Sequence, residues 1–173
     1  MDRLVSPSFT PDFLAQAFCV VPELAHTTPV AHILTDSRSL VMPASTLFFA
    51  IRTDSGDGHQ YIAQLYEAGV RSFVVEQLSA EDKARYVGAN WYLVPSSVKA
   101  LEALARAHRE RFARLQTVGI TGSNGKTIVK ALLYQLLAPC LRTVRSPRSY
   151  NSQIGVPLSV LSITEEDEVA LIE

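Results

Sequence analysis

Features that would direct a protein to a membrane, to the cell exterior or to nucleic acid are scarce in this sequence. No apolar run approaches the ~18 residues that a membrane-spanning helix needs, and Met1–Leu4 lacks the basic start of a signal peptide, so neither is expected. The two cysteines, Cys19 and Cys140, are far apart and fit a reduced, cytoplasmic compartment. A net charge of −1 over 173 residues gives no reason to expect attraction to nucleic acid or to a membrane surface.

The sequence also lacks the residue patterns typical of a protein-bound metal site and of a catalytic nucleophile with its base. His26, His32 and His108 have no partners at metal-ligand spacing, and no nucleophile–base pattern is evident. The hydrophobic content of 47% is nevertheless enough for a sizeable core in one or two domains.

Alternating strand-like and helix-like segments predict a small α/β domain over residues 1–115. Thr10-Pro11 is a typical helix start, and Gly69 is a typical helix stop. Residues 77–85 are expected to be a polar surface stretch, and the basic run 106–114 is interpreted as a solvated face and linker. The expected helices are 11–18, 58–68 and 97–112, and the expected strands are 33–35, 46–51, 70–76 and 91–94.

The most informative segment is 117–130, Thr-Val-Gly-Ile-Thr-Gly-Ser-Asn-Gly-Lys-Thr-Ile-Val-Lys. Its apolar start is typical of a buried strand, 122–125 is a glycine-bearing loop, and the apolar period from Ile128 to Leu137 predicts a helix. A strand, such a loop and a helix N-terminus together form a phosphate cradle, because backbone N–H groups and the helix dipole both favour an anion there.

Lys126 and Thr127 are the strongest candidates for chemistry in that segment. A lysine here reaches the terminal phosphates of a nucleotide, and a threonine hydroxyl can ligate Mg²⁺. The general pattern G-x-x-x-x-G-K-[ST] is missed, since Ile120 stands at the first glycine position, which argues against a generic P-loop kinase.

A second α/β unit is predicted from Gln116 onward, with helices at 127–137 and 156–163. Strands are expected near 141–144 and at 168–172, the latter as an unfinished and therefore sticky sheet edge. Glu173 follows that strand, and a carboxylate at the C-terminal end of a parallel strand lies beside the phosphate loop in this kind of sheet. Three strands do not complete an ATP-binding domain, so the chain is interpreted as the front portion of a longer enzyme.

The loop Thr121–Thr127 resembles that of the Mur ligases, the ATP-dependent enzymes that build the peptide stem of cell-wall precursors. Residues 35–38 with 47–50, and the Asp-Gly-His at 57–59, are similar to the uridine-binding domain of that family. The segment 151–158, Asn-Ser-Gln-Ile-Gly-Val-Pro-Leu, is similar to the MurF type. Residues 146–153 also resemble MurF proteins that carry a fused alanine racemase, a partner domain that the resemblance therefore suggests.

The resemblance implies a fold and a set of site residues. The expected fold is a small α/β substrate-binding domain, 1–115, followed by the first part of a P-loop-type parallel-sheet ATPase domain, 116–173. Lys126 is expected to be catalytic, and Thr127 and Glu173 to hold Mg²⁺. The ATP-binding residues are expected to be Gly122, Ser123, Asn124, Gly125, Lys126 and Thr127, and the substrate-binding residues Asp36, Ser37, Arg38, Ala50, His59 and Asn151.

The implied reaction is the addition of D-alanyl-D-alanine to UDP-N-acetylmuramoyl-tripeptide with ATP and Mg²⁺, in the cytoplasm. An alternative is a binding module for UDP-sugar precursors whose phosphate loop is catalytically idle. A folylpolyglutamate-synthetase-like ligase shares the loop, but it would place the loop near the chain start, whereas ~115 residues precede it here.

Overall fold

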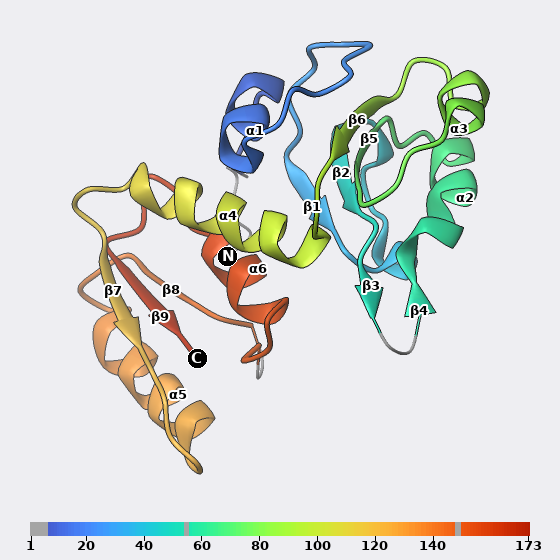
Figure 1. Ribbon diagram of the computed structural model, residues 1–173. Coiled ribbons are helices and arrows are strands. Elements are labelled where there is room, and N and C mark those ends of the chain that lie inside the picture. Colours follow the sequence, from blue (N-terminus) through green and yellow to red (C-terminus); the bar gives the residue numbers. More distant parts are fainter. Residues whose placement is uncertain (1–6, 54–55, 148–149) are drawn as a thin grey trace. The chain divides into compact units, whose positions relative to one another are not determined.

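The computed structural model of this chain describes residues 7–53, 56–147 and 150–173. Its contacts divide the chain into two compact units, here called the N-terminal unit (Ser8–Ala100) and the C-terminal unit (Leu101–Glu173). Each unit contains its own parallel sheet (Figure 1). Within the described residues, no helix is both long enough and apolar enough to cross a membrane.

The sheet of the N-terminal unit has four parallel strands in the order β1-β2-β5-β6. A separate antiparallel pair of strands, β3-β4, lies outside this sheet. The strands are β1 His32–Leu34, β2 Thr46–Phe49, β3 Arg52–Thr53, β4 Gly56–Asp57, β5 Ser72–Val75 and β6 Asn90–Leu93.

The helices of this unit begin and end largely where local signals place them. The Thr10 side chain accepts a hydrogen bond from the Phe13 N–H (3.3 Å), which confirms the predicted start of α1. Gly69, at φ +103°, follows α2 as predicted. The helices are α1 Pro11–Phe18, α2 Ile62–Glu67 and α3 Ala80–Arg85, with 3₁₀ turns η1 Ser37–Ser39, η2 Pro43–Ser45 and η3 Gly58–Tyr61; α4, Ser97–Glu110, continues into the C-terminal unit.

Two of these elements differ from the predictions. Residues 77–85 lie at the surface as expected, but they also contain a helix that was not expected, α3, which begins with a capping box between Ser79 and Asp82. The expected helix 58–68 begins as the 3₁₀ turn η3. Its Asp57 cap and the close approach of Gly58 to the Ile51 backbone hold this turn in place, since a Cβ on Gly58 would lie 2.7 Å from Ile51 N.

The central strands β2 and β5 are buried at every position, because helices cover both faces of the sheet (Figure 1). On one face, Phe48 and Phe73 pack with Ile62 and Leu65 of α2. On the other, Phe18 of α1 makes edge contacts with Phe49 and Tyr92. The prediction that 46–51 is a strand buried on both faces is confirmed for β2.

The C-terminal unit contains three parallel strands in the order β7-β9-β8. Alternate side chains of β9 divide between two helices: Ala170 and Ile172 pack with Val156 and Val160 of α6, whereas α5 lies on the opposite face (Figure 1). The elements are β7 Gln116–Gly119, α5 Lys126–Leu137, β8 Thr143–Arg145, α6 Gly155–Leu161 and β9 Val169–Ile172.

Two predictions about these strands are wrong. β9 is not an open edge, since it pairs with β7 on one side and β8 on the other, and all four of its residues are buried. Crossover connections allow strands distant in sequence to become neighbours, so the last strand can enter the middle of a sheet. β7 is not buried: it forms an edge of the sheet and is exposed at all four positions, because α5 packs mainly on β8 and β9.

Candidate functional site

The loop between β7 and α5 contains two glycines in backbone conformations that favour glycine. Gly122 has φ +148° and Gly125 has φ +77°, values that residues with a Cβ rarely adopt. Gly125 is also the N-cap of α5. The two glycines predicted from the pattern are therefore required by the local geometry.

The N-terminus of α5 is open to an anion. No side chain among the described residues caps the helix, and the N–H groups of a first turn have no intrahelical acceptors. Lys126, the first residue of α5, donates a hydrogen bond from Nζ to the Gly122 carbonyl oxygen at 2.6 Å, so its ammonium lies over the loop. The helix dipole and this ammonium place positive charge on the same side of the loop.

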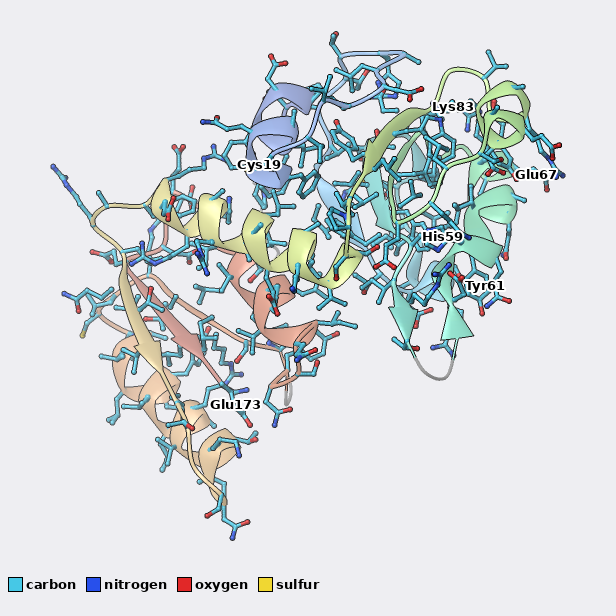
Figure 2. All side chains as sticks on the ribbon, in the orientation of Figure 1. Cys19, His59, Tyr61, Glu67, Lys83 and Glu173 are labelled. Atoms are coloured by element: carbon cyan, nitrogen blue, oxygen red, sulfur yellow. The ribbon has the colours of Figure 1, made fainter. Side chains whose placement is uncertain are left out.

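A carboxylate lies next to this loop. Glu173, at the C-terminal end of β9 (Figure 2), accepts hydrogen bonds from the Thr127 hydroxyl, at 3.0 Å to Oε1 and 3.2 Å to Oε2. Its backbone N–H donates to Ser146 Oγ at 3.1 Å, which fixes the residue at the strand end. The predicted pair Thr127 and Glu173 is thus brought together across 46 positions of sequence.

The Glu173 carboxylate is held in its charged form. The hydrogen bond from Lys130, followed by that from Thr127, lowers its pKa below the ordinary value, although burial opposes this shift. Lys130 Nζ lies 2.6 Å from Glu173 Oε2, and both side chains are almost fully buried. Sequence reasoning missed Lys130; the available signal was a second lysine, one helical turn after Lys126, in an otherwise apolar segment.

A cavity of about 520 Å³ is lined by both Lys126 and Glu173. Asn151, which the sequence suggested as a substrate contact, lies on its wall together with Lys126 and Glu173. Its lining residues are Gly119, Ile120, Thr121, Gly122, Lys126, Asn151, Val156, Ile172 and Glu173.

The oxygen donors at this cavity fit a hard divalent cation. Mg²⁺ is usually held by one or two protein oxygen ligands together with substrate phosphates and water, rather than by an all-protein cage. Thr127 and Glu173 supply such a pair, and the described residues contain no group of three or more His, Cys, Asp or Glu side chains that could hold a metal without phosphate.

In the N-terminal unit, the predicted residues Asp36, Ser37 and Arg38 form a single 3₁₀ turn. Asp36 caps η1 through the Arg38 N–H and pairs with the Arg38 guanidinium at 2.7 Å. The Arg38 side-chain hydrogen bond lowers the pKa of Asp36 to about 2. Both side chains are well exposed, so this pair contributes little to stability and remains accessible to a ligand.

Ala50 and His59, also predicted to contact substrate, make internal contacts. Ala50 is fully buried, and its carbonyl oxygen accepts a hydrogen bond from Ser97 Oγ at 3.0 Å. His59 Nδ1 lies 2.5 Å from Asp57 Oδ1, and Nε2 accepts the Glu76 N–H at 3.1 Å, which places the ring proton on Nδ1. The His59 backbone N–H, then its side chain and Arg52, lower the pKa of Asp57 to about 2.

Comparison with protein families gives two adjoining matches. Residues 29–109 match the catalytic domain of the Mur ligase family, and residues 120–173 match the Mur ligase middle domain. These matches cover both the η1 turn of the N-terminal unit and the phosphate loop of the C-terminal unit.

Individual relatives agree with the family matches. A UDP-N-acetylmuramoyl-tripeptide–D-alanyl-D-alanine ligase of Synechocystis is 32% identical over 161 residues, 93% of this chain and 34% of the relative. The ligase of the same name from Haemophilus influenzae is 34% identical over 148 residues, 83% of this chain and 31% of the relative. The chain therefore spans about a third of the length of the curated relatives it matches.

Solved structures show the same similarity in three dimensions. A MurF structure from Acinetobacter baumannii superposes with a TM-score of 0.87 at 27% identity, covering 97% of this chain and 36% of that one. The MurF ligase of Thermotoga maritima in complex with ADP has a TM-score of 0.68 at 28% identity, covering 81% of this chain and 31% of that one. The predicted fold, an α/β arrangement with parallel sheets, is confirmed.

Proposed function

The chain belongs to the Mur ligase family, and on that premise we propose that it forms the N-terminal part of a MurF-type ligase. The full enzyme would add D-alanyl-D-alanine to UDP-N-acetylmuramoyl-tripeptide with ATP, in the cytoplasm. Residues 1–115 would bind the UDP-linked precursor, and 116–173 would begin the ATP-binding domain. The relatives' names and the phosphate loop between β7 and α5 support this proposal.

The observation that carries the proposal is the convergence of five predicted residues. Gly122, Lys126, Asn151 and Glu173 line one cavity, and Thr127 is hydrogen-bonded to Glu173. A cation, an amide and a carboxylate–hydroxyl pair around an uncapped helix N-terminus are the groups that a nucleoside triphosphate and its divalent cation need.

The reaction would proceed in two steps, a phosphoryl transfer and an acyl transfer. The substrate carboxylate attacks the γ-phosphorus of ATP, and ADP leaves. The amine of D-alanyl-D-alanine then attacks the acyl phosphate carbon, an amide bond forms, and phosphate leaves with release of a proton. Lys126 would exchange the Gly122 carbonyl for phosphate oxygens and offset the charge that develops there. Mg²⁺, held by Thr127 and Glu173, would neutralise charge on the phosphates when bound.

In the N-terminal unit, Asp36, Ser37 and Arg38 would contact the uridine end of the substrate. His59 would shape that region through its contacts with Asp57 and Glu76 rather than by donating directly, since both ring nitrogens are engaged. Asn151 would face the substrate from the ATP side. A fused alanine racemase domain, suggested by residues 146–153, is a hypothesis that the coding sequence beyond codon 173 would test.

One observation favours the alternative of a binding module with an idle loop. Lys126 and Thr127 are both satisfied by protein acceptors, the Gly122 carbonyl and the Glu173 carboxylate. An idle loop would keep these bonds, whereas a working one would exchange them when nucleotide enters.

Calorimetric titration of the 173-residue chain with an ATP analogue and Mg²⁺ distinguishes the ligase from the binding module with an idle loop. We expect binding by the wild-type chain and a loss of about tenfold or more in Lys126→Ala, because a charge-assisted hydrogen bond to phosphate is removed.

Lys99→Ala is the matched control for this titration. Lys99, like Lys126, lies in the first turn of a helix, that of α4, but it is exposed and outside the cavity, so its removal should leave affinity unchanged. Precursor binding that survives Lys126→Ala, in a chain that binds no nucleotide at all, would favour the idle-loop module instead.

A further inference from the structure

Lys130 is a buried cation for which the proposed reaction has no assigned task. It lies on α5 one helical turn after Lys126, and only 3% of its surface is exposed. Its Nζ atom is 2.6 Å from Glu173 Oε2 and 3.4 Å from Ser146 Oγ. Lys130, Glu173, Thr127 and Ser146 form what is here called the buried ammonium cluster.

Stability alone is a weak explanation for this cluster. Removing a lysine and a glutamate from water is costly, and apolar side chains of similar size often stabilise a protein as well as such a pair does. Val144, Ala170 and other core residues show that this unit packs apolar side chains elsewhere. The position of the ammonium, rather than its contribution to packing, therefore calls for an explanation.

The position is notable because the ammonium contacts the same carboxylate that would hold the cation. Thr127 and Lys130 are on one helix, three residues apart, and both bond to Glu173. An ion between Thr127 and Glu173 would lie a few ångströms from the Lys130 charge, where like charges near a protein surface or interior repel appreciably. A triphosphate would bring the negative charge that offsets this repulsion.

We infer that Lys130 is a positioning residue that fixes the Glu173 carboxylate against Thr127 and disfavours a divalent cation there until nucleotide is bound. This inference rests on the proposed function. Cation and nucleotide would then bind with positive coupling, and by linkage each would raise the affinity for the other by the same factor.

The test measures Mn²⁺ binding by electron paramagnetic resonance, with the 173-residue chain and the metal alone. We expect Lys130→Met to bind Mn²⁺ about tenfold more tightly than the wild-type chain, because a like charge beside the ligand carboxylate is gone. Lys130→Arg keeps the charge and should behave as wild type. Adding Glu173→Gln to Lys130→Met should abolish the gain, which assigns the metal to this carboxylate.

Unchanged or weaker Mn²⁺ binding by a folded Lys130→Met chain would overturn the inference, since a merely structural lysine predicts no gain. If circular dichroism shows that the Lys130→Met chain is unfolded, the inference is tested instead by Mn²⁺ binding to the wild-type chain with and without ADP. Saturable Mn²⁺ binding without nucleotide, as tight as with ADP, would refute the coupling, and binding that saturates only with ADP would support it. Failure of the proposed function has a different signature: no nucleotide binding by the wild-type chain, with or without metal.

Discussion

The two units of this chain have the same kind of architecture but differ in how completely it is covered. In the N-terminal unit, the central strands β2 and β5 are buried at every position. In the C-terminal unit, β7 is exposed along its whole length, and α5 leaves Ile128 and Leu136 67% and 73% exposed. Parallel sheets normally have both faces covered. The exposed strand β7 and the exposed apolar side chains of α5 therefore set the C-terminal unit, which carries the loop between β7 and α5, apart from the N-terminal unit.

In the less covered C-terminal unit, specific hydrogen bonds fix the residues around the cavity. The Thr127 hydroxyl donates to the Glu173 carboxylate, and the Glu173 N–H donates to Ser146 Oγ. Binding loops are generally drawn from the less stable parts of a structure, where local contacts can be exchanged. Here Gly122 and Gly125 permit the positive φ angles of the loop, and in the proposed function Lys126 would exchange the Gly122 carbonyl for phosphate oxygens.

The largest expected effect contrasts one core residue with one exposed apolar residue. Phe73→Ala should lower the free energy of unfolding of the N-terminal unit by about 3–5 kcal/mol, because Phe73 is fully buried between Phe48 and Trp91. Leu132→Ala should change stability by less than about 0.5 kcal/mol, because Leu132 is 55% exposed. Urea unfolding measures both, and equal losses would contradict the contrast between the units.

A smaller effect should appear as a pH dependence of the C-terminal unit. His108 is buried against Phe112, and its Nε2 lies 2.9 Å from the Ile163 carbonyl oxygen. Burial lowers the pKa of His108 below its ordinary value. The unfolded chain therefore takes up a proton first as pH falls, and the free energy of unfolding should decrease below about pH 6.5 by up to ~1.4 kcal/mol per pH unit.

Two variants isolate this effect in urea unfolding at several pH values. His108→Gln keeps a donor for the Ile163 carbonyl but does not titrate, so the decrease between pH 7 and 5 should shrink. His32→Gln, at a partly exposed histidine of the N-terminal unit, is the histidine variant with which it is compared. An unaltered pH slope in His108→Gln would show that other groups cause it.

The smallest expected effect is a gain in the N-terminal unit. Cys19 ends α1 in the left-handed conformation, at φ 54°, the one such non-glycine residue in the described part of the chain. Figure 2 shows it at the end of α1, and its thiol is exposed. Cys19→Gly should relieve this backbone strain and stabilise the unit by about 0.5–1 kcal/mol.

Thermal unfolding measures the Cys19→Gly gain, and Cys140→Gly supplies the control at the other exposed cysteine. Cys140 follows α5 without a positive φ, so glycine there should bring no gain. A loss of stability in Cys19→Gly would mean that the thiol makes contacts that outweigh the strain.

Local signals predicted much of the fold and the loop. The Thr10-Pro11 start of α1, the Gly69 stop and the glycines of the phosphate loop depend on neighbours within a few residues, so the sequence suffices to identify them. The α3 helix was missed although its signal, Ser79 three residues before Asp82, is also local. Asp57 as the partner of His59 was missed as well.

The predictions that were wrong concern relations between distant segments. Whether 168–172 is an edge depends on which strands pair with it, and β7 and β8 do so only after two crossovers return the chain to the sheet. The exposure of β7 likewise depends on where α5 packs. Neither can be deduced from apolar content, because an edge strand and a central strand can carry the same residues.

The sequence by itself determined most of the helices and strands, the family resemblance and the glycine-bearing loop between β7 and α5, because propensities, caps and glycine conformations act over a few residues. Only the tertiary structure decided that Lys130 is buried against Glu173, the carboxylate that the sequence had placed beside Thr127. Such contacts depend on the order of the strands and on which face of the sheet α5 covers. Those choices are made by packing over the whole unit, where burial of apolar surface and satisfaction of charges are balanced together.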